Sequence, residues 1–222
     1  MKQWIAAGAL GLAFGAAHAA PVTFTKLTGL TGGTLAGTAV YKADLSAFAG
    51  QSFASISIAD ASAGLGGAPG QFSGFDLDAI YFSAIDCADA ACAQAAAVTP
   101  LLDYSNTVFT AGAQRAPADP ALFGSNASLT VNNAVATLGA FDGESSTVTP
   151  FGFLSMGDNG VLAINFFAAT DISALRLYIG EVGDNGEVAA SSITLSPNRV
   201  PEPATLALMA AGLIALGVRR RG

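Results

Sequence analysis

The chain has 222 residues, a formal net charge of −7 and only 11% charged residues. A protein that binds nucleic acid through its phosphates needs a basic face, so this acidic balance disfavours nucleic acid as a partner. The single histidine, His18, lies in a segment that we expect to be removed. The mature chain then has neither Ser-His-Asp nor Cys-His catalysis nor a histidine-ligated metal, and we expect that it is not an enzyme.

The amino-terminal segment has the layout of a secretory signal peptide. A positively charged start precedes an uncharged apolar run at 4–16, and Ala17 and Ala19 then supply the two small residues that signal peptidase requires. We expect cleavage after Ala19, so that residues 1–19 form the signal peptide and the protein is exported. The alternative is a permanent membrane anchor, but the run is shorter than the roughly 20 residues of a spanning helix.

Residues 20–199 are predicted to form one extracytoplasmic domain. Short stretches of β-branched and aromatic residues alternate with small polar ones between glycine-rich turns, which predicts an all-β fold, an antiparallel β-sandwich of jelly-roll type. The turn at 183–186 contains Asn-Gly, which favours an antiparallel hairpin between 175–181 and 188–195. A helical turn is expected near 88–97 and a long loop at 110–128. The expected strands are 22–27, 37–42, 52–59, 75–85, 128–138, 161–168, 174–182 and 189–196.

The segment 71–80 contains two acidic residues, Asp76 and Asp78, at alternate positions. On a strand both carboxylates project from one face, where they repel each other unless a cation joins them. Hard carboxylate oxygens suit Ca²⁺, so the pair is a candidate calcium site, and no other cofactor is expected. The competing interpretation is a strand that begins with solvated acids and becomes buried further along.

Cys87 and Cys92 are the two cysteines of the chain. An even pair in an exported protein predicts a disulfide. The bond would close a loop of six residues and stabilise the fold by about 2 kcal/mol on the chain-entropy model. A redox role would favour two intervening residues rather than four, so we interpret the pair as structural.

Sugar binding and carboxylate catalysis are the two activities that the residues leave open. A glycan-binding module needs exposed aromatic side chains on a concave sheet face, whereas a structural module does not. A glycosidase needs two carboxylates that face each other across a cleft, and the sequence identifies no such pair. Three further acids could also bind a metal ion, although their position in turns is a sufficient structural reason for their presence: Asp158, Asp184 and Glu187. The aromatic candidates, which otherwise lie at the core edge, are Tyr41, Tyr81, Tyr104 and Tyr178.

The carboxyl-terminal residues 200–222 differ in composition from the domain before them. The sequence Pro201-Glu202-Pro203 is stiff and extended, because both prolines block helix propagation. The uncharged run 204–218 follows, and as a helix it spans roughly 22 Å, short of the roughly 30 Å hydrocarbon core. Arginines resist translocation, so the cluster after the run predicts a membrane-inserted helix with the domain outside. This cluster consists of Arg219, Arg220 and Arg221.

A Pro-Glu-Pro motif, a short apolar helix and an arginine cluster, in this order, resemble the PEP-CTERM sorting signal. The resemblance covers residues 200–222 only. In that family the signal is recognised by exosortase, a membrane-embedded cysteine transpeptidase or protease that cuts near the motif. The resemblance therefore implies a Gram-negative host, often one that makes exopolysaccharide. The processing partners would be signal peptidase and exosortase, with the helix held transiently in the inner membrane.

The leading interpretation is an exported, exosortase-processed protein of the outer surface or extracellular matrix, with a structural or adhesive role and no catalysis. Exopolysaccharide is its candidate partner, although fifteen acidic against five basic residues at 20–199 repel an anionic polymer unless cations bridge the two. The alternatives are a calcium-dependent carbohydrate-binding module and, third, a glycoside hydrolase that uses carboxylates only. An uncleaved tail anchor in the inner membrane is the alternative to processing.

Overall fold

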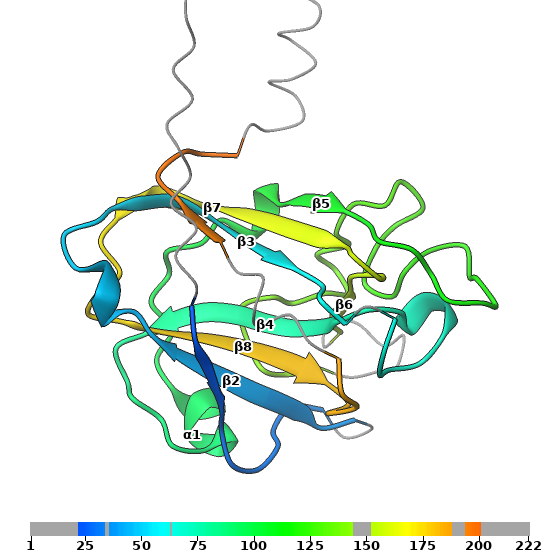
Figure 1. The fold of residues 1–222 in the computed structure, drawn as a ribbon, viewed down its shortest axis with the longest axis horizontal. Coiled ribbons are helices and arrows are strands. Elements are labelled where there is room, and N and C mark those ends of the chain that lie inside the picture. Colours follow the sequence, from blue (N-terminus) through cyan, green and yellow to red (C-terminus); the bar gives the residue numbers. More distant parts are fainter. Residues whose placement is uncertain (1–21, 34–35, 63, 144–151, 188–193, 201–222) are drawn as a thin grey trace, which may run out of the picture.

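The described part of the chain is almost entirely β-structure, arranged as two antiparallel sheets that lie one above the other (Figure 1). The computed structural model describes residues 22–33, 36–62, 64–143, 152–187 and 194–200. The expected signal peptide, with Ala17 and Ala19, and the sorting segment from Pro201 onward lie outside these residues. Within the described ranges, no helix is long and apolar enough to cross a membrane.

The strand order interleaves early and late parts of the chain. One sheet has five strands and the other has four, and β8 lies between β2 and β4 while β7 lies between β5 and β3. Such interleaving brings distant segments together as the jelly-roll prediction requires. The five-stranded sheet runs β1 (Phe24–Lys26), β2 (Thr38–Asp44), β8 (Arg176–Val182), β4 (Asp76–Ser83), β6 (Leu154–Ser155). The four-stranded sheet runs β5 (Val108–Thr110), β7 (Val161–Thr170), β3 (Phe53–Ala59), β9 (Thr194–Ser196).

Helical structure in the described residues consists of single turns between the strands. The helical turn expected near 88–97 is present as α1, which crosses the outer side of the five-stranded sheet in Figure 1. The short helices are α1 (Ala90–Ala95), η1 (Ser46–Phe48), η2 (Gly70–Phe72) and η3 (Tyr104–Asn106).

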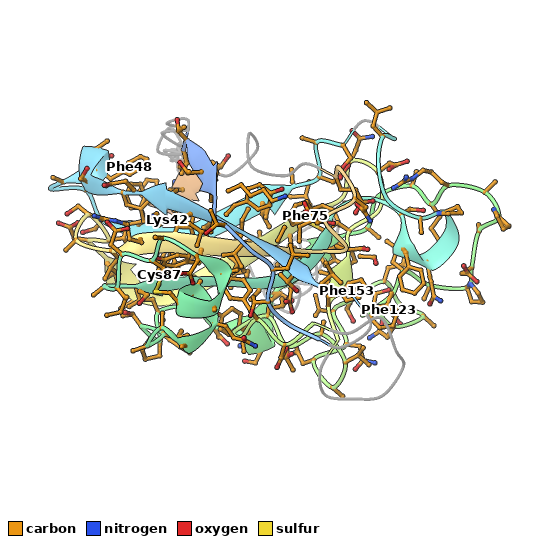
Figure 2. All side chains as sticks on the ribbon, turned by 90° about the horizontal axis from the view of Figure 1, so that it is seen from below. Lys42, Phe48, Phe75, Cys87, Phe123 and Phe153 are labelled. Atoms are coloured by element: carbon orange, nitrogen blue, oxygen red, sulfur yellow. A yellow bond between two sulfur atoms is a disulfide. The ribbon has the colours of Figure 1, made fainter. Side chains whose placement is uncertain are left out.

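The main hydrophobic core lies between the two sheets. Alternate residues of both sheets point inward, and the rings of Phe82 on β4 and Phe166 on β7 meet across the gap with centroids 5.4 Å apart. Phe48 belongs to this core and lies towards one end of the molecule in Figure 2, whereas Phe123 and Phe153 form a separate small cluster with Val182. Core residues shared between the sheets include Leu77, Ile80, Leu177 and Ile179 on one side and Ile56, Ile58, Leu162 and Ile164 on the other.

Two features of the predicted fold are wrong. The strand expected at 128–138 is a series of turns, because Asn126 Oδ1 accepts hydrogen bonds from the backbone N–H groups of Ser128 and Thr130 at 2.9 and 3.2 Å. Such local bonds compete with a strand ladder. The expected hairpin after β8 is not formed by the described residues, because β2 and β4 occupy both edges of β8, and β9 pairs with β3 in the other sheet; residues 188–193 of its second strand lie outside the described residues.

Candidate functional site

The last described residues, 197–200, leave β9 and cross the outer face of the four-stranded sheet. The side-chain amide of Asn165 on β7 makes two hydrogen bonds with Val200. Its Nδ2 donates to the carbonyl oxygen at 3.0 Å, and its Oδ1 accepts from the N–H at 2.8 Å. The Ser55 hydroxyl on β3 donates to the Asn198 carbonyl at 2.7 Å. We call Ser55 and Asn165 the C-terminal clamp.

The clamp residues are buried although they lie on the outer face of their sheet. Ser55 and Asn165 are paired across β3 and β7, and they are only 3% and 1% exposed. Their neighbours Ile56 and Ile164 belong to the core between the sheets, so by strand alternation the clamp side chains point outward. Their hydrogen bonds to Asn198 and Val200 place the segment 197–200 against them.

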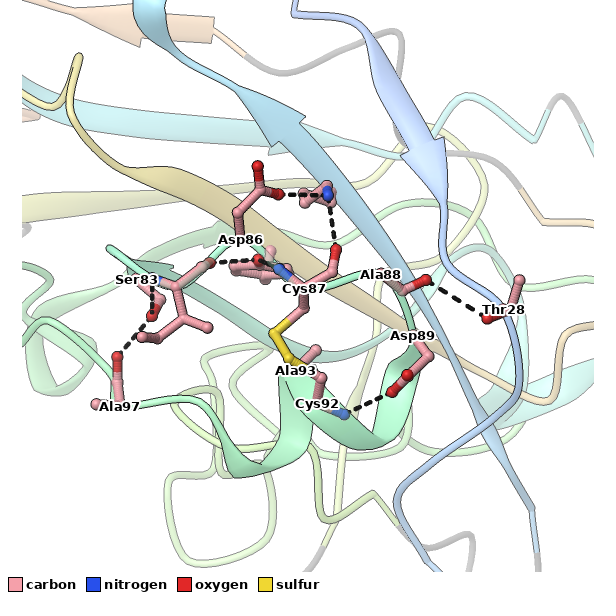
Figure 3. Close-up of a disulfide and its surroundings, with 12 residues drawn as sticks. Thr28, Ser83, Asp86, Cys87, Ala88, Asp89, Cys92, Ala93 and Ala97 are labelled. Carbon is pink, nitrogen blue, oxygen red and sulfur yellow. Dashed lines mark hydrogen bonds and ion pairs between the residues drawn. A yellow bond between two sulfur atoms is a disulfide. The ribbon is translucent and has the colours of Figure 1, made fainter.

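The predicted disulfide between Cys87 and Cys92 is confirmed, and Figure 3 shows it beside α1. Asp89 caps the helix, because its Oδ1 accepts from the Cys92 N–H at 2.8 Å. Lys42 on β2 holds the start of the loop by donating to Asp86 Oδ1 and to the Cys87 carbonyl, both at 2.6 Å. The disulfide thus closes a loop that is tied to the five-stranded sheet.

The loop of the disulfide covers two of the tyrosines that were candidates for sugar stacking. Tyr81 and Tyr178 stack with ring centroids 5.5 Å apart and are 2% and 0% exposed. The Tyr178 hydroxyl accepts from the Cys87 N–H at 2.9 Å and donates to the Ile85 carbonyl at 2.7 Å. These two rings therefore serve as the floor of the loop and offer no open surface to a sugar.

The other two candidate tyrosines are partly buried. Tyr41 and Tyr104 both pack against the main core. The Tyr104 hydroxyl donates to the Ile80 carbonyl at 2.7 Å, and Tyr104 lines a shallow hollow of about 350 Å³ together with Leu138 and Thr137. None of the four tyrosines stands exposed on a sheet face.

Asp76 and Asp78 lie in β4 as predicted, but both are buried rather than solvated, at 4% and 0% exposure. Each carboxylate has its own hydroxyl donor at 2.5 Å: Ser155 Oγ donates to Asp76 and Thr38 Oγ1 donates to Asp78. Burial raises the pKa of Asp78 to about 7 and raises the pKa of Asp76 well above its usual value. In the described part of the chain no group of three or more His, Cys, Asp or Glu side chains could hold a metal ion. Calcium binding at this pair stays a prediction.

A second group of acids surrounds Arg115 near the ends of β4 and β8. The guanidinium donates from Nη2 to Glu187 Oε1 at 2.9 Å, and its Nε lies 3.3 Å from Asp158 Oδ1. Burial raises the pKa of Glu187 to about 7 against the opposing effect of Arg115. Burial and the nearby Glu187 raise the pKa of Glu181 to about 8. The packing is close, because a Cβ on Gly67 would lie 1.7 Å from Glu187 Oε1.

We use the name Arg115 cluster for Arg115 and the acids around it, which are Asp76, Asp158, Glu181 and Glu187. Three of these acids have a raised pKa and expose little surface to a substrate. The exposed fractions of Asp76, Glu181 and Glu187 are 4%, 1% and 2%. Glu181 Oε1 and Glu187 Oε2 are buried atoms without a hydrogen-bond partner. A glycosidase pair would instead face an open cleft. The cluster therefore offers pH-dependent stability rather than an evident active site.

The residues with the most informative contacts, those of the C-terminal clamp and Arg115, carry little signal in the sequence. Asn165 could have been noticed, because it interrupts the apolar run of β7 with an amide. Ser55 carries no such signal, since small polar residues alternate throughout β3. Arg115 lies in the predicted long loop, and nothing in its neighbours indicates that it meets Glu187 from a turn 72 residues away.

Residues 199–221 match the family model described as the PEP-CTERM protein-sorting motif. The matched residues begin with Arg199, between the two residues whose backbones the clamp holds. No curated protein and no solved structure matches the chain. The class defined here is a β-sandwich domain joined to a sorting signal. That signal is a PEP-CTERM motif, which implies export, targeting to exosortase and a carboxyl-terminal membrane anchor before processing.

Proposed function

We propose that the protein is a non-catalytic component of the outer surface or extracellular matrix, released from the inner membrane by exosortase. The observation that carries the proposal is the direct junction of the sorting motif with a folded sandwich: the clamp holds Val200, and Pro201 is the next residue. The folded domain is then the part delivered to the outside, with a structural or adhesive role.

The two alternatives have less support from the described residues. A calcium-dependent glycan binder would use exposed aromatic rings, but Tyr81 and Tyr178 are covered by the disulfide loop. A hydrolase acting through carboxylates would need an open pair, but Asp76 and Glu181 are buried. Exopolysaccharide as the partner also requires bridging cations, because acidic residues outnumber basic ones by ten at 20–199.

The test is the intact mass of the protein recovered from its native host. Processing predicts a species that lacks residues 1–19 and also lacks the apolar run with the arginine cluster. A mature protein that retains residues 204–222 would contradict the proposal and show an uncleaved tail anchor.

A matched pair of variants makes this test specific to the motif. Glu202→Gln removes the one charge of the Pro-Glu-Pro sequence, and Asp171→Asn removes one charge from an exposed turn of the sandwich. We expect the precursor to accumulate with Glu202→Gln and to be processed normally with Asp171→Asn. Equal processing of both variants would argue that the motif does not direct cleavage.

A further inference from the structure

The C-terminal clamp reaches the sorting motif itself. Asn165 presents one N–H donor and one C=O acceptor to Val200, as a neighbouring strand would present a peptide group. Arg199 adds a contact by donating to the Phe167 carbonyl at 3.3 Å. The backbone immediately before Pro201 is therefore already engaged with the domain's own sheet.

An enzyme that takes an extended peptide binds it through the same main-chain N–H and C=O groups. Val200 cannot offer these groups to an enzyme while they are bonded to Asn165, and the Asn198 carbonyl is likewise occupied by Ser55. Docking on the sandwich and binding in an enzyme groove that covers residues 198–200 therefore exclude each other.

We infer that the C-terminal clamp restrains the upstream flank of the sorting motif and that exosortase cleaves the chain only after the clamp has opened. This inference rests on the proposed function. Cleavage of a folded protein follows the population of the locally opened form when opening is fast compared with cleavage. Weakening the clamp then accelerates processing, and the folded sandwich sets the rate at which the protein leaves the membrane.

The variants follow from the contacts. Asn165→Ala removes both bonds to Val200, and the loss of two hydrogen bonds raises the opened population roughly tenfold. Asn165→Asp keeps the acceptor for the Val200 N–H but sets a carboxylate oxygen against the Val200 carbonyl, so it opens the clamp with almost no change in volume. The matched control is Ser57→Ala, because Ser57 lies on the same face of β3 and pairs with Thr194 rather than with the segment.

The first measurement uses the rate of trypsin cleavage to report how often the clamp opens, in the absence of exosortase. Trypsin cuts after arginine, and the Arg199–Val200 bond lies inside the clamp whereas the arginine cluster lies beyond the apolar run. Full-length protein purified in detergent should be cut at Arg199 about ten times faster with Asn165→Ala or Asn165→Asp than in the wild type or with Ser57→Ala. Cleavage at the arginine cluster should not change. Equal cleavage at Arg199 in all four proteins would overturn the inference.

The second measurement follows the precursor in the native host by pulse-chase. The inference predicts a shorter precursor half-time in both Asn165 variants and an unchanged half-time with Ser57→Ala. A wild-type precursor that is processed at the same rate as an Asn165 variant with a proven open clamp would overturn the inference and leave the proposed function intact. A wild-type precursor that is never processed would instead overturn the proposed function. Thermal melts of each variant confirm that the sandwich is folded.

Discussion

The outer faces of the two sheets are covered by different kinds of structure. The face of the five-stranded sheet carries α1, the disulfide loop and a second apolar cluster in which Tyr81, Tyr178 and Phe141 are at most 2% exposed. The face of the four-stranded sheet has no such layer at Phe167, which is 61% exposed, and it is crossed by the segment 197–200. The outer face of the five-stranded sheet is thus covered by large buried side chains. The outer face of the four-stranded sheet is covered at the clamp by a backbone segment that hydrogen bonds hold in place.

The two faces differ in how strongly their covering layers are held. Aromatic rings buried under a cross-linked loop stabilise the fold because their apolar surface is removed from water. Exposing these rings requires a large opening of the structure, so it is rare. A few hydrogen bonds to an extended segment contribute far less to the free energy of unfolding, so this segment can detach while the rest of the domain stays folded. On the proposed function, the domain stays folded outside the cell and is also cut free of its tail, and the two kinds of surface suit these two requirements.

The largest expected effect comes from removing the floor of the disulfide loop. Tyr178→Ala deletes a fully buried ring, and we expect the free energy of unfolding to fall by about 3–5 kcal/mol. Tyr178→Phe keeps the ring but leaves the Ile85 carbonyl and the Cys87 N–H without their partner, at a cost of about 1–3 kcal/mol. Urea unfolding of both variants measures the two losses, and equal losses would mean that the ring itself contributes nothing.

The Arg115 cluster predicts an unusual pH dependence. The folded pKa of Glu181 is about 8, above the 4.5 of the unfolded chain, so the folded state binds more protons between these values. Stability contributed by this proton is present below about pH 4.5 and is lost as the pH rises towards 8. Asp78 and Glu187, each with a pKa of about 7, act in the same direction.

The measurement is the melting temperature between pH 5 and pH 8. It should fall across this window, and Glu181→Gln should make the fall shallower because the amide does not titrate. Asp171→Asn should leave the slope unchanged, since that carboxyl is exposed and its pKa is already lowered by the Ser173 backbone and side chain. A melting temperature that rises from pH 5 to pH 8 in the wild type would contradict the cluster's raised pKa values.

A smaller effect is expected from the cross-link above Tyr178. Cys92→Ser removes the disulfide and should lower the free energy of unfolding by about 2 kcal/mol, because the closed loop contains only six residues. The wild type under reducing conditions is the control and should lose a similar amount. No loss in either case would show that α1 and its hydrogen bonds hold the loop without the bond.

The smallest effect is expected on the other face. Phe167→Ala changes an exposed ring, so the free energy of unfolding should stay within about 0.5 kcal/mol of the wild type. Phe141→Ala is the matched change on the covered face and should cost several times more. If the two alanine variants have the same free energy of unfolding, the two faces do not differ in how much they contribute to stability.

The strands and the disulfide could be predicted from local pattern. Apolar alternation placed β2, β3, β4, β7 and β8 close to their observed bounds, because each of them buries at least one face in the core. An even pair of cysteines in a chain expected to be exported was sufficient to predict the disulfide between Cys87 and Cys92.

Long-range partners could not be predicted in the same way. The Asn-Gly turn after β8 suited a hairpin, but the pairing was decided by β2 and β4 filling both edges of β8. The acids of β4 gave no sign that Ser155 and Thr38 would bury them. The clamp depends on the register between β3 and β7 that pairs Ser55 with Asn165. The periodicity of a sequence indicates which face of a strand is buried, but it does not indicate which residues of two strands pair.

The position of Val200 also limits how far the folded domain can stand from the membrane before processing. Three residues, Pro201 to Pro203, separate Val200 from Ala204, where the apolar run begins, and the four steps from one Cα to the next span at most about 14 Å in extended chain. The headgroup region on one side of a bilayer takes up about half of that length. With the clamp closed and the predicted helix inserted, the four-stranded sheet is tethered within a few water layers of the lipid surface. An enzyme embedded in that membrane would then meet its substrate across a gap narrower than the sandwich itself.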